Sequence, residues 1–281
     1  MRFAFSTVAC PDWTIERVVR ACVEYGYAGV EMRSFGAGGT ELACEPALTD
    51  GSKIQRLCDD AGVMVAGIAT GARFDARVWP PVIGHLSAKK EASVQEGRHL
   101  VDVAVACQAR YVRVYGFEIA KGERRQRAVR RIVERLGRVV DHAQNRDLEV
   151  VLENGGSFSR AEELAEIIDA VGSPLLGACY DVQAAHAAGE DVLGGVALLG
   201  AMLRVARVRD RKGGIPCVIG DGELGCEGMV RALGSRSGVW VVFSWDRLWR
   251  PELASADEVL PQAAERLATW ASAGAASGAA A

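Results

Sequence analysis

The sequence lacks the features that mark membrane-bound, secreted or nucleic-acid-binding proteins. No stretch approaches the roughly 18 consecutive apolar residues of a membrane-spanning helix, and Asp12 interrupts the N-terminus MRFAFSTVACPDW too early for a signal peptide. Aromatic residues make up only 6% of the chain, the net charge is −3, and no basic stripe is interleaved with aromatic residues. These absences argue against a membrane protein and against a nucleic-acid partner, and they predict a cytoplasmic protein.

Paired cysteines are also missing. The eight cysteines include no C-x-x-C pair, and several of them lie inside apolar patterns, which is typical of small buried residues in a reducing compartment. A zinc site or a disulfide framework is therefore not expected. The remaining composition is ordinary for a globular protein, 49% hydrophobic and 25% charged, and 281 residues are enough for a large core.

Short apolar segments alternate with amphipathic helical segments along the whole chain. Eight segments are apolar and rich in β-branched residues, which predicts strands at 3–6, 29–32, 63–69, 111–115, the first half of 148–156, 175–180, 203–208 and 239–243. Alternating strands and helices predict a parallel sheet covered by helices, and eight such units match a closed (β/α)8 TIM barrel. A doubly wound open sheet is the alternative, but STVACPDW after the first strand lacks the glycines of a phosphate-binding turn.

We assign residues 1–272 to a single barrel domain, because no linker interrupts the alternation. Residues 273–281 are small and featureless, and we expect them to be a disordered Ala/Gly tail.

The fifth expected strand ends in an unusual way. LEVVLENGG is an apolar run that stops at Glu153, and Asn154 and two glycines follow. A carboxylate at the tip of a buried strand is costly to desolvate unless a partner pairs with it. Because chemistry in a TIM barrel lies at the C-terminal ends of the strands, Glu153 is the first candidate for a functional site.

Other strand ends are polar as well. The candidates for binding a substrate are Glu31, Arg33, Arg73, Arg113, Tyr115, Arg209, Ser244 and Asp246, with Trp245, Trp249 and Trp13 as candidates for the pocket wall. The arginines together favour an anionic or carboxylate-bearing ligand. For each arginine alone a solvated or structural role explains the residue equally well, and core or rim packing is the alternative for the tryptophans.

Six short motifs follow one another along the chain: PDWTIERVVRACVEYGYAGVEMR, RVYG, LEN, YD, GDGEL and SWDRLWRPEL. By their order and spacing they resemble the xylose isomerase-like barrels, the sugar phosphate isomerase/epimerase family. The resemblance covers nearly the whole chain. It implies a TIM barrel that carries out acid–base chemistry beside a carbonyl of a small polar substrate, and it allows a homodimer.

The resemblance also implies four metal ligands, Glu, Asp, His and Glu, on the last four strands. Here the first two positions are Glu153 and Asp181, but Arg207 stands in place of the histidine and Ser244 in place of the last glutamate. A guanidinium is always charged and cannot coordinate a cation. We therefore expect no metal cofactor, with a divalent metal as the disfavoured alternative.

We hypothesise instead that Arg207 takes the place of the metal and pairs with Glu153 and Asp181. These three side chains carry the same net charge as three carboxylates and a divalent ion. A purely structural ion network is the alternative interpretation of the same residues.

Two functions follow from this hypothesis. In the first, Glu153, Asp181 and Arg207 are the catalytic residues of an isomerase, epimerase or dehydratase. Glu153 acts as a general acid or base, and Arg207 stabilises a developing enolate. Loss of the carboxylate at position 244 removes the second base of an epimerase, which favours isomerisation or β-elimination unless Asp246 or Tyr115 substitutes. In the second, the chain is a non-catalytic relative that binds a small molecule or a partner protein.

Overall fold

The structure is a computed structural model of the chain, and it describes residues 1–35, 41–42, 51–75, 88–234 and 236–278. Eight parallel strands form a closed ring in the order β1-β11-β8-β7-β6-β5-β4-β2, and β2 pairs back with β1. These strands are β1 (Arg2–Ser6), β2 (Gly29–Phe35), β4 (Met64–Ala69), β5 (Tyr111–Phe117), β6 (Glu149–Gly156), β7 (Leu176–Asp181), β8 (Leu203–Val208) and β11 (Trp240–Phe243). The expected (β/α)8 barrel is confirmed, and each of the eight expected strands is present.

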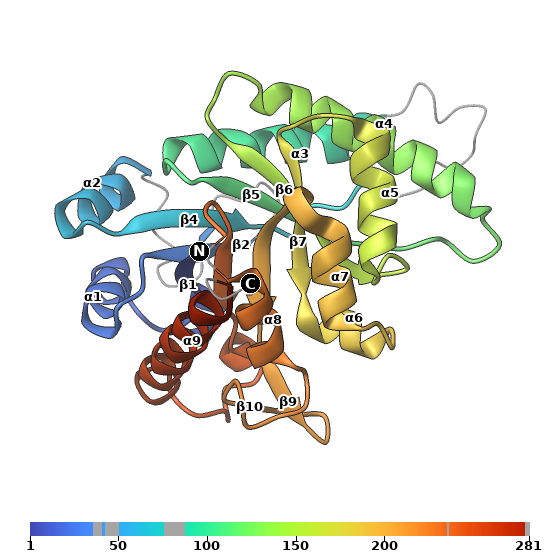
Figure 1. Cartoon of the computed structure of the whole chain (residues 1–281). Coiled ribbons are helices and arrows are strands. Elements are labelled where there is room, and N and C mark those ends of the chain that lie inside the picture. The colour runs from blue at the N-terminus through green and yellow to red at the C-terminus, as the bar shows by residue number, and fades with distance from the viewer. Residues whose placement is uncertain (36–40, 43–50, 76–87, 235, 279–281) are drawn as a thin grey trace.

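Helices surround the ring of strands on its outside (Figure 1). They are α1 (Ile15–Tyr25), α2 (Gly51–Ala61), α3 (Ala88–Ala106), α4 (Arg125–Ala143), α5 (Ala161–Val171), α6 (Val182–Ala187), α7 (Val192–Leu199), α8 (Cys226–Leu233) and α9 (Ala256–Gly278). Their ends follow local sequence signals. At the start of α1 the Thr14 hydroxyl accepts a hydrogen bond from the N–H of Arg17, and α1 ends at Gly26 in the left-handed conformation that glycine favours.

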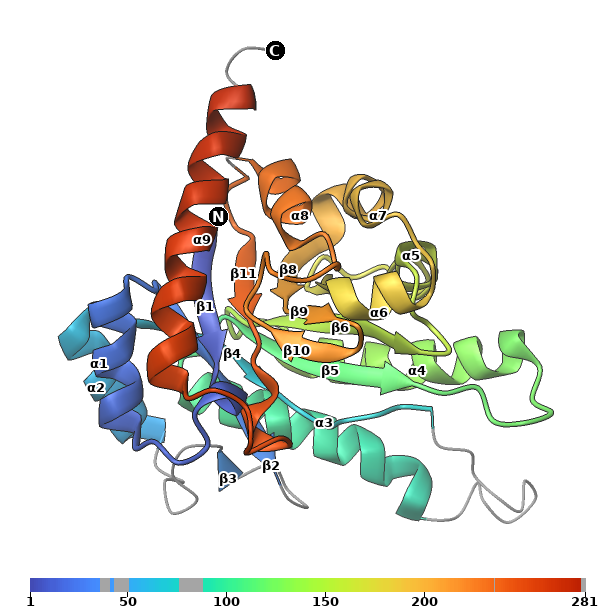
Figure 2. The ribbon, with the colours of Figure 1, turned by 90° about the horizontal axis from the view of Figure 1, so that it is seen from below.

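The last helix extends further than the sequence suggests. Helix α9 continues to Gly278 and so includes most of the segment assigned to a disordered tail. Alanine is the strongest helix former, which explains how an alanine-rich segment can prolong an existing helix. Figure 2 shows α9 beside α8 and β1, so the end of the chain covers the side of the barrel where the chain begins. Among the described helices, none combines the length and the apolar character that crossing a bilayer would require.

Two small antiparallel elements were not expected from the sequence. Strand β3 (Glu41–Leu42) pairs with the end of β2, and strands β9 (Asp210–Lys212) and β10 (Ile215–Cys217) form a hairpin directly after β8. The Asp210 carboxylate accepts hydrogen bonds from the backbone N–H groups of Gly220, Gly222 and Leu224, which fixes the GDGEL loop. A Cβ atom at Gly222 would lie 2.2 Å from Oδ1 of Asp210, so this loop requires glycine there.

The core has an outer layer and an inner plug. A large apolar cluster lies between the strands and the helices. Inside the barrel the plug consists of Ala4, Ala66, Tyr111, Val151, Cys179, Val205, Trp240 and Val242, all buried. The ring of Tyr111 fits because its neighbour Gly67 has no side chain; a Cβ there would lie 2.1 Å from the ring. The plug closes the N-terminal end of the barrel and leaves the C-terminal end for chemistry.

Candidate active site

A layer of polar side chains covers the apolar plug. Side chains of a strand alternate between its two faces, so the residue two positions after an inward residue also points inward. Six polar residues lie two positions after a plug residue, each from a different strand, and all six are buried. They are Ser6, Arg113, Glu153, Asp181, Arg207 and Ser244. The closed barrel therefore brings together residues that are far apart in the sequence.

A cavity of about 360 Å³ opens at this end of the barrel. Among the described residues, six arginines and two carboxylates line it, so this part of its wall carries a surplus of positive charge. The lining residues are Ser6, Val8, Arg33, Arg113, Glu153, Arg207, Arg209, Arg211, Ser244, Asp246, Trp249 and Arg250.

Arg207 is the central side chain of this layer. Its Nη2 lies 2.7 Å from both carboxylate oxygens of Glu31, and its Nε lies 3.1 Å from Oε2 of Glu153. The hydroxyl of Tyr111 donates a further hydrogen bond of 2.9 Å to Glu31. The expected pairing of Arg207 with Glu153 is thus present. The expected pairing with Asp181 is replaced by one with Glu31, which the sequence analysis had placed among the substrate-binding residues.

Asp181 pairs with a different arginine. The Nε and Nη2 of Arg209 donate to its two carboxylate oxygens. Oδ1 of Asp181 also accepts the backbone N–H of Gln183 at 2.7 Å, so the same carboxylate caps helix α6. The side chain of Asn154 fastens β6 to β7, because it accepts the N–H of Asp181 at 2.6 Å and donates to its carbonyl oxygen at 3.1 Å. Asp181 thus lies behind the cavity wall.

Glu153 lines the cavity and uses only one of its carboxylate oxygens for protein contacts. Its Oε2 accepts hydrogen bonds from Nη1 of Arg113 at 2.5 Å, from Arg207, and from the thiol of Cys179 at 3.5 Å. Within the described part of the chain, no group donates to its Oε1, and none accepts from Nη1 of Arg207. A carboxylate oxygen and a guanidinium nitrogen from two paired residues are therefore left to a ligand.

The paired charges favour the ionised forms of Glu31, Asp181 and Arg207. Burial alone would raise the pKa of Glu31, but Arg207 and Arg113 outweigh it and hold that pKa below its ordinary value. The pKa of Asp181 is lowered in the same way, because Arg209 outweighs the effect of burial. Burial would lower the pKa of Arg207, but Glu31 and Glu153 raise it well above its usual range. The pKa of Arg33 is lowered to about 10, mainly by burial and next by the positive charge of Arg113.

The structure brings several of the other expected residues to the cavity. Arg33, Arg113, Arg209, Ser244, Asp246 and Trp249 all line it. Nη1 of Arg33 donates to the carbonyl oxygen of Thr70 at 2.6 Å. Asp246 lies between two arginines, 3.5 Å from Arg209 and 3.0 Å from Arg211.

Of the remaining expected residues, three do not line the cavity, and the side chain of a fourth lies outside the described part. Arg73 is half-exposed and pairs with Asp75 at 2.6 Å. Trp245 is buried, and its indole N–H donates to the carbonyl oxygen of Ala254 at 2.9 Å, so its position is that of a core residue. Trp13 is buried as well. Tyr115 belongs to β5, but its side chain lies outside the described part.

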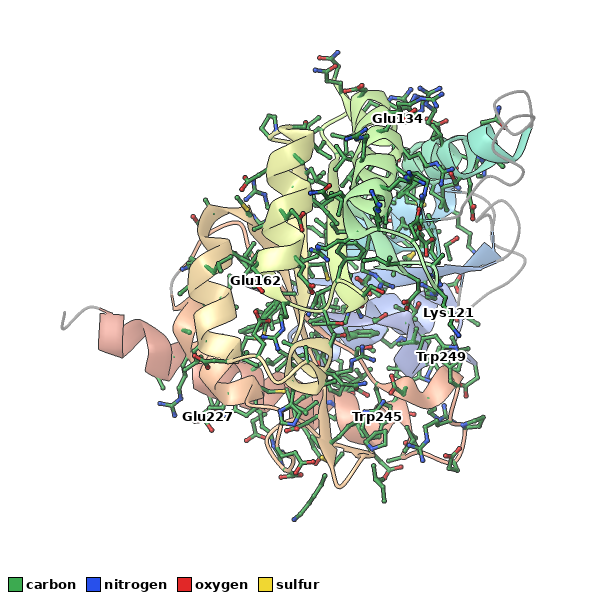
Figure 3. The ribbon with its side chains drawn as sticks, turned by 90° about the vertical axis from the view of Figure 1, so that its right-hand side faces the viewer. Lys121, Glu134, Glu162, Glu227, Trp245 and Trp249 are labelled. Atoms are coloured by element: carbon green, nitrogen blue, oxygen red, sulfur yellow. The ribbon has the colours of Figure 1, made fainter. Side chains whose placement is uncertain are left out.

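Four of the described cavity residues, Ser6, Val8, Arg211 and Arg250, were not among the candidates from the sequence. Ser6 could have been found from the inward alternation that begins at Ala4. Arg211 lies on the unexpected hairpin, and Arg250 follows the last strand in a loop whose path the sequence does not reveal. Figure 3 labels Trp245 and Trp249, which both lie on this C-terminal segment.

The residues at the four metal positions do not fit a divalent cation. Glu153 holds two guanidinium groups on one oxygen, both oxygens of Asp181 are bound by Arg209, and the other two positions are Arg207 and Ser244. Over the described ranges of the chain, no group of three or more His, Cys, Asp or Glu side chains is arranged to hold a metal ion. Hard divalent cations require several such oxygen or imidazole ligands.

Comparison with known proteins gives a family and a set of related folds. Residues 19–269 match the family model described as a xylose isomerase-like TIM barrel. Among solved structures, the probable 3-DHS dehydratase AsbF from Bacillus anthracis has a TM-score of 0.75 at 14% identity, covering 95% of this chain and 99% of that one. The IolI protein with a bound zinc atom has a TM-score of 0.79 at 16% identity, covering 97% and 99%.

D-psicose 3-epimerase from Clostridium cellulolyticum H10, solved with D-tagatose, has a TM-score of 0.74 at 12% identity, covering 98% of this chain and 99% of that one. A search of curated proteins found no match. At these identities the similarity to solved structures establishes the fold alone.

Proposed function

Because this chain belongs to the xylose isomerase-like TIM barrel family, we propose that it is a metal-independent enzyme that performs acid–base chemistry beside a carbonyl of a small polar substrate. The observation that carries this proposal is the pairing of Glu153 with Arg207 at the cavity, where each keeps one polar atom for a ligand. A base and a cation held side by side are what proton abstraction next to a carbonyl requires.

In the proposed reaction, Oε1 of Glu153 takes the proton from the carbon adjacent to the substrate carbonyl. The electron pair of the broken C–H bond forms the C=C bond of an enolate, and the carbonyl oxygen gains negative charge. Nη1 of Arg207 donates a hydrogen bond to that oxygen. Glu31 and Tyr111 hold the guanidinium of Arg207 in place from behind, so it need not reorganise as the charge develops.

The fate of the enolate depends on what Glu153 does with the proton. Its delivery to the former carbonyl carbon gives an isomer, as the proton of the adjacent hydroxyl moves to the former carbonyl oxygen and that hydroxyl oxygen becomes the new carbonyl. Its delivery to a hydroxyl group on the next carbon gives dehydration, as the enolate re-forms the carbonyl and its electron pair expels water. Epimerisation by two opposed bases is disfavoured, because Ser244 has no carboxylate and Asp246 is already paired with Arg209 and Arg211. The named structural relatives include both epimerases and a probable dehydratase, so the fold does not choose between these reactions.

We further propose that the substrate is anionic. Among the described residues, six arginines line the cavity, and the five carboxylates that line it or pair with its arginines, Glu31, Glu153, Asp181, Asp246 and Glu252, leave one positive charge in surplus. An anionic substrate would neutralise this surplus as it displaces water from the cavity.

A non-catalytic binding protein is the second candidate. The observation that favours it is that the buried charged side chains already pair with one another. Ion pairs such as Arg207–Glu31 also occur as purely structural links. The two candidates differ in one measurable respect, since only an enzyme exchanges a carbon-bound proton with solvent.

The test is hydrogen–deuterium exchange on a panel of keto-sugars and keto-acids, with protein that has been treated with a chelator and analysed for metals. Glu153→Gln should lower the exchange rate by about 10²–10⁴-fold while ligand affinity is kept. Glu149→Gln is the matched control, because Glu149 begins the same strand at the other end of the barrel and should leave exchange unchanged.

Three results would count against the proposal. A stoichiometric divalent ion bound through Glu153 and Asp181 would refute metal independence. Exchange that survives in Glu153→Gln would remove the assigned base. Substrate-like binding without exchange in the wild type, across the panel, would favour the non-catalytic candidate.

A further inference from the structure

Two serines end neighbouring strands of the barrel at the floor of the cavity. Strands β1 and β11 pair in parallel with Phe5 opposite Phe243, and Ser6 and Ser244 are the next residue on each. Ser6 is 1% exposed and Ser244 is 4% exposed, and both line the cavity. Both residues therefore line the cavity while being buried from bulk solvent.

Among the described residues, neither hydroxyl has a hydrogen-bond partner. The Oγ of Ser6 is buried and makes no hydrogen bond. Ser244 uses its backbone N–H, which donates to the carbonyl oxygen of Val208 at 3.0 Å, and none of the described groups bonds its Oγ. Buried polar groups are nearly always hydrogen-bonded, because leaving one unpaired costs free energy. An unpaired hydroxyl on a cavity floor is therefore a position at which a ligand group can supply the missing hydrogen bond.

A cation lies beside the two serines. Arg207 on β8 reaches Glu31 on β2, and the two strands that separate β8 from β2 are β11 and β1, which carry the serines. Ser6 is also directly in register with Glu31. The guanidinium of Arg207 thus passes alongside both strand ends, and its Nη1 has no acceptor among the described side chains.

We propose that Ser6, Ser244 and Nη1 of Arg207 form a binding subsite for an oxyanion group of the substrate, a carboxylate or a phosphate. A guanidinium offers donors only, and each serine hydroxyl can rotate to donate, so the three groups together suit oxygens that carry negative charge. The surplus of arginines around the cavity favours the same class of ligand over a neutral polyol. The inference rests on the proposed function only in taking this cavity as the substrate site.

Binding of small probes tests the subsite without any knowledge of the reaction. Affinities for oxalate, inorganic phosphate and the neutral sugar D-fructose are measured by isothermal titration calorimetry at low salt, for the wild type, Ser6→Ala and Ser244→Ala. The anions should bind and D-fructose should not. Each substitution should weaken anion binding by about 10-fold or more, because a hydrogen bond to a charged group is lost. The stronger of the two anions identifies a carboxylate or a phosphate.

Ser237→Ala is the matched control, because Ser237 lines a separate hollow with Glu149 at the opposite end of the barrel. It should bind the anions as the wild type does. The stability of the ligand-free protein is a second readout. Ser6→Ala removes a buried hydroxyl that has no partner, so its melting temperature without ligand should equal or exceed that of the wild type. A structural serine would instead lose stability.

The proposal is overturned if both serine variants bind the anions as tightly as the wild type does, or if D-fructose binds more tightly than either anion. It is also overturned if Ser6→Ala lowers the stability of the free protein and leaves anion affinity unchanged. Proton exchange in the wild type separates this proposal from the proposed function. Anion binding that depends on the serines, without proton exchange in the wild type, supports the subsite and refutes the enzyme. Proton exchange in the wild type without serine-dependent anion binding supports the enzyme and refutes the subsite.

Discussion

Arg207 and Glu31 lie on strands that are separated in the barrel by two others, and yet Nη2 of Arg207 is 2.7 Å from both carboxylate oxygens of Glu31. Both side chains are buried, and the contact joins β8 directly to β2 across β11 and β1. A charge at such a position is stabilised by its partner and not by water, which makes the pair sensitive to the loss of either member.

Removing the charge of Glu31 should destabilise the protein strongly. Glu31→Gln keeps the shape of the side chain but leaves the Arg207 charge only partly compensated, and we expect a loss of about 3–5 kcal/mol in the free energy of unfolding. Urea denaturation measures it. In a double-mutant cycle with Arg207→Met, the two losses should be far from additive. The control Glu149→Gln breaks a partly exposed pair with Arg204 and should cost about 1 kcal/mol or less. Equal losses in the two variants would contradict the special position of Glu31.

The same network predicts how stability depends on pH. The folded-state pKa values of Glu31 and Asp181 lie below their ordinary values of 4.5 and 3.8. Their contribution to stability is therefore fully present above about pH 5 and is lost progressively as the pH falls through 4.5 and below, because the unfolded chain binds protons first. Free energies of unfolding at several pH values should show this decline, and Glu31→Gln should make it shallower. An equally steep decline in that variant would show that other groups are responsible.

Asp181 should matter more for its ion pair than for its helix cap. Asp181→Asn keeps an oxygen that can accept the N–H of Gln183, since asparagine is a good cap, but it removes the charge that pairs with Arg209. We expect a loss of several kcal/mol in the free energy of unfolding. Asp191 caps helix α7 from an exposed position, so Asp191→Asn should change stability by only about 0.5 kcal/mol. Similar effects of the two changes would mean that capping dominates at both sites.

Substitutions of two tryptophans in the same segment should affect different properties, ligand binding in one case and stability in the other. Trp249 lines the cavity with 58% of its surface exposed, so Trp249→Ala should weaken binding of the substrate or of an anionic probe while stability changes by about 0.5 kcal/mol or less. Trp245 is buried and packs against Phe243, so Trp245→Ala should lose about 3–5 kcal/mol. Calorimetric titration and urea denaturation on both variants check the pair. The opposite assignment of effects would restore Trp245 as the pocket wall expected from the sequence.

The architecture could be predicted because each level of the sequence agrees on it. Apolar runs of strand length, helix signals and polar strand ends all repeat in step, so the barrel and the location of its site followed from local patterns. The partner of Arg207 could not be predicted in the same way. Glu31 and Asp181 are both carboxylates at strand ends, and only the order of strands in the closed ring and the reach of the guanidinium decide between them.

Other residues were hidden for similar reasons. Trp245 looked like a pocket wall because it follows a strand end, but the backbone turns it into the core, where it bonds Ala254. Arg211 reaches the cavity from a hairpin of three-residue strands, too short to leave a hydrophobic pattern. Ser6 was missed because the inward alternation from Ala4 indicates only that its side chain points into the barrel, and a lone serine carries no further signal of its role. Its significance depends on the cavity that seven other strands enclose.

The contact between Arg113 and Glu153 limits how this barrel could be redesigned. Restoring histidine at position 207 and glutamate at position 244 would recreate the ligand types of a metalloenzyme, but Arg113 would still occupy Oε2 of Glu153 at 2.5 Å, and Arg209 would still hold Asp181. An incoming cation would meet two fixed positive charges beside its ligands. Conversion into a metal-dependent relative would therefore require at least four coordinated replacements, so no single reversion can be expected to confer metal binding.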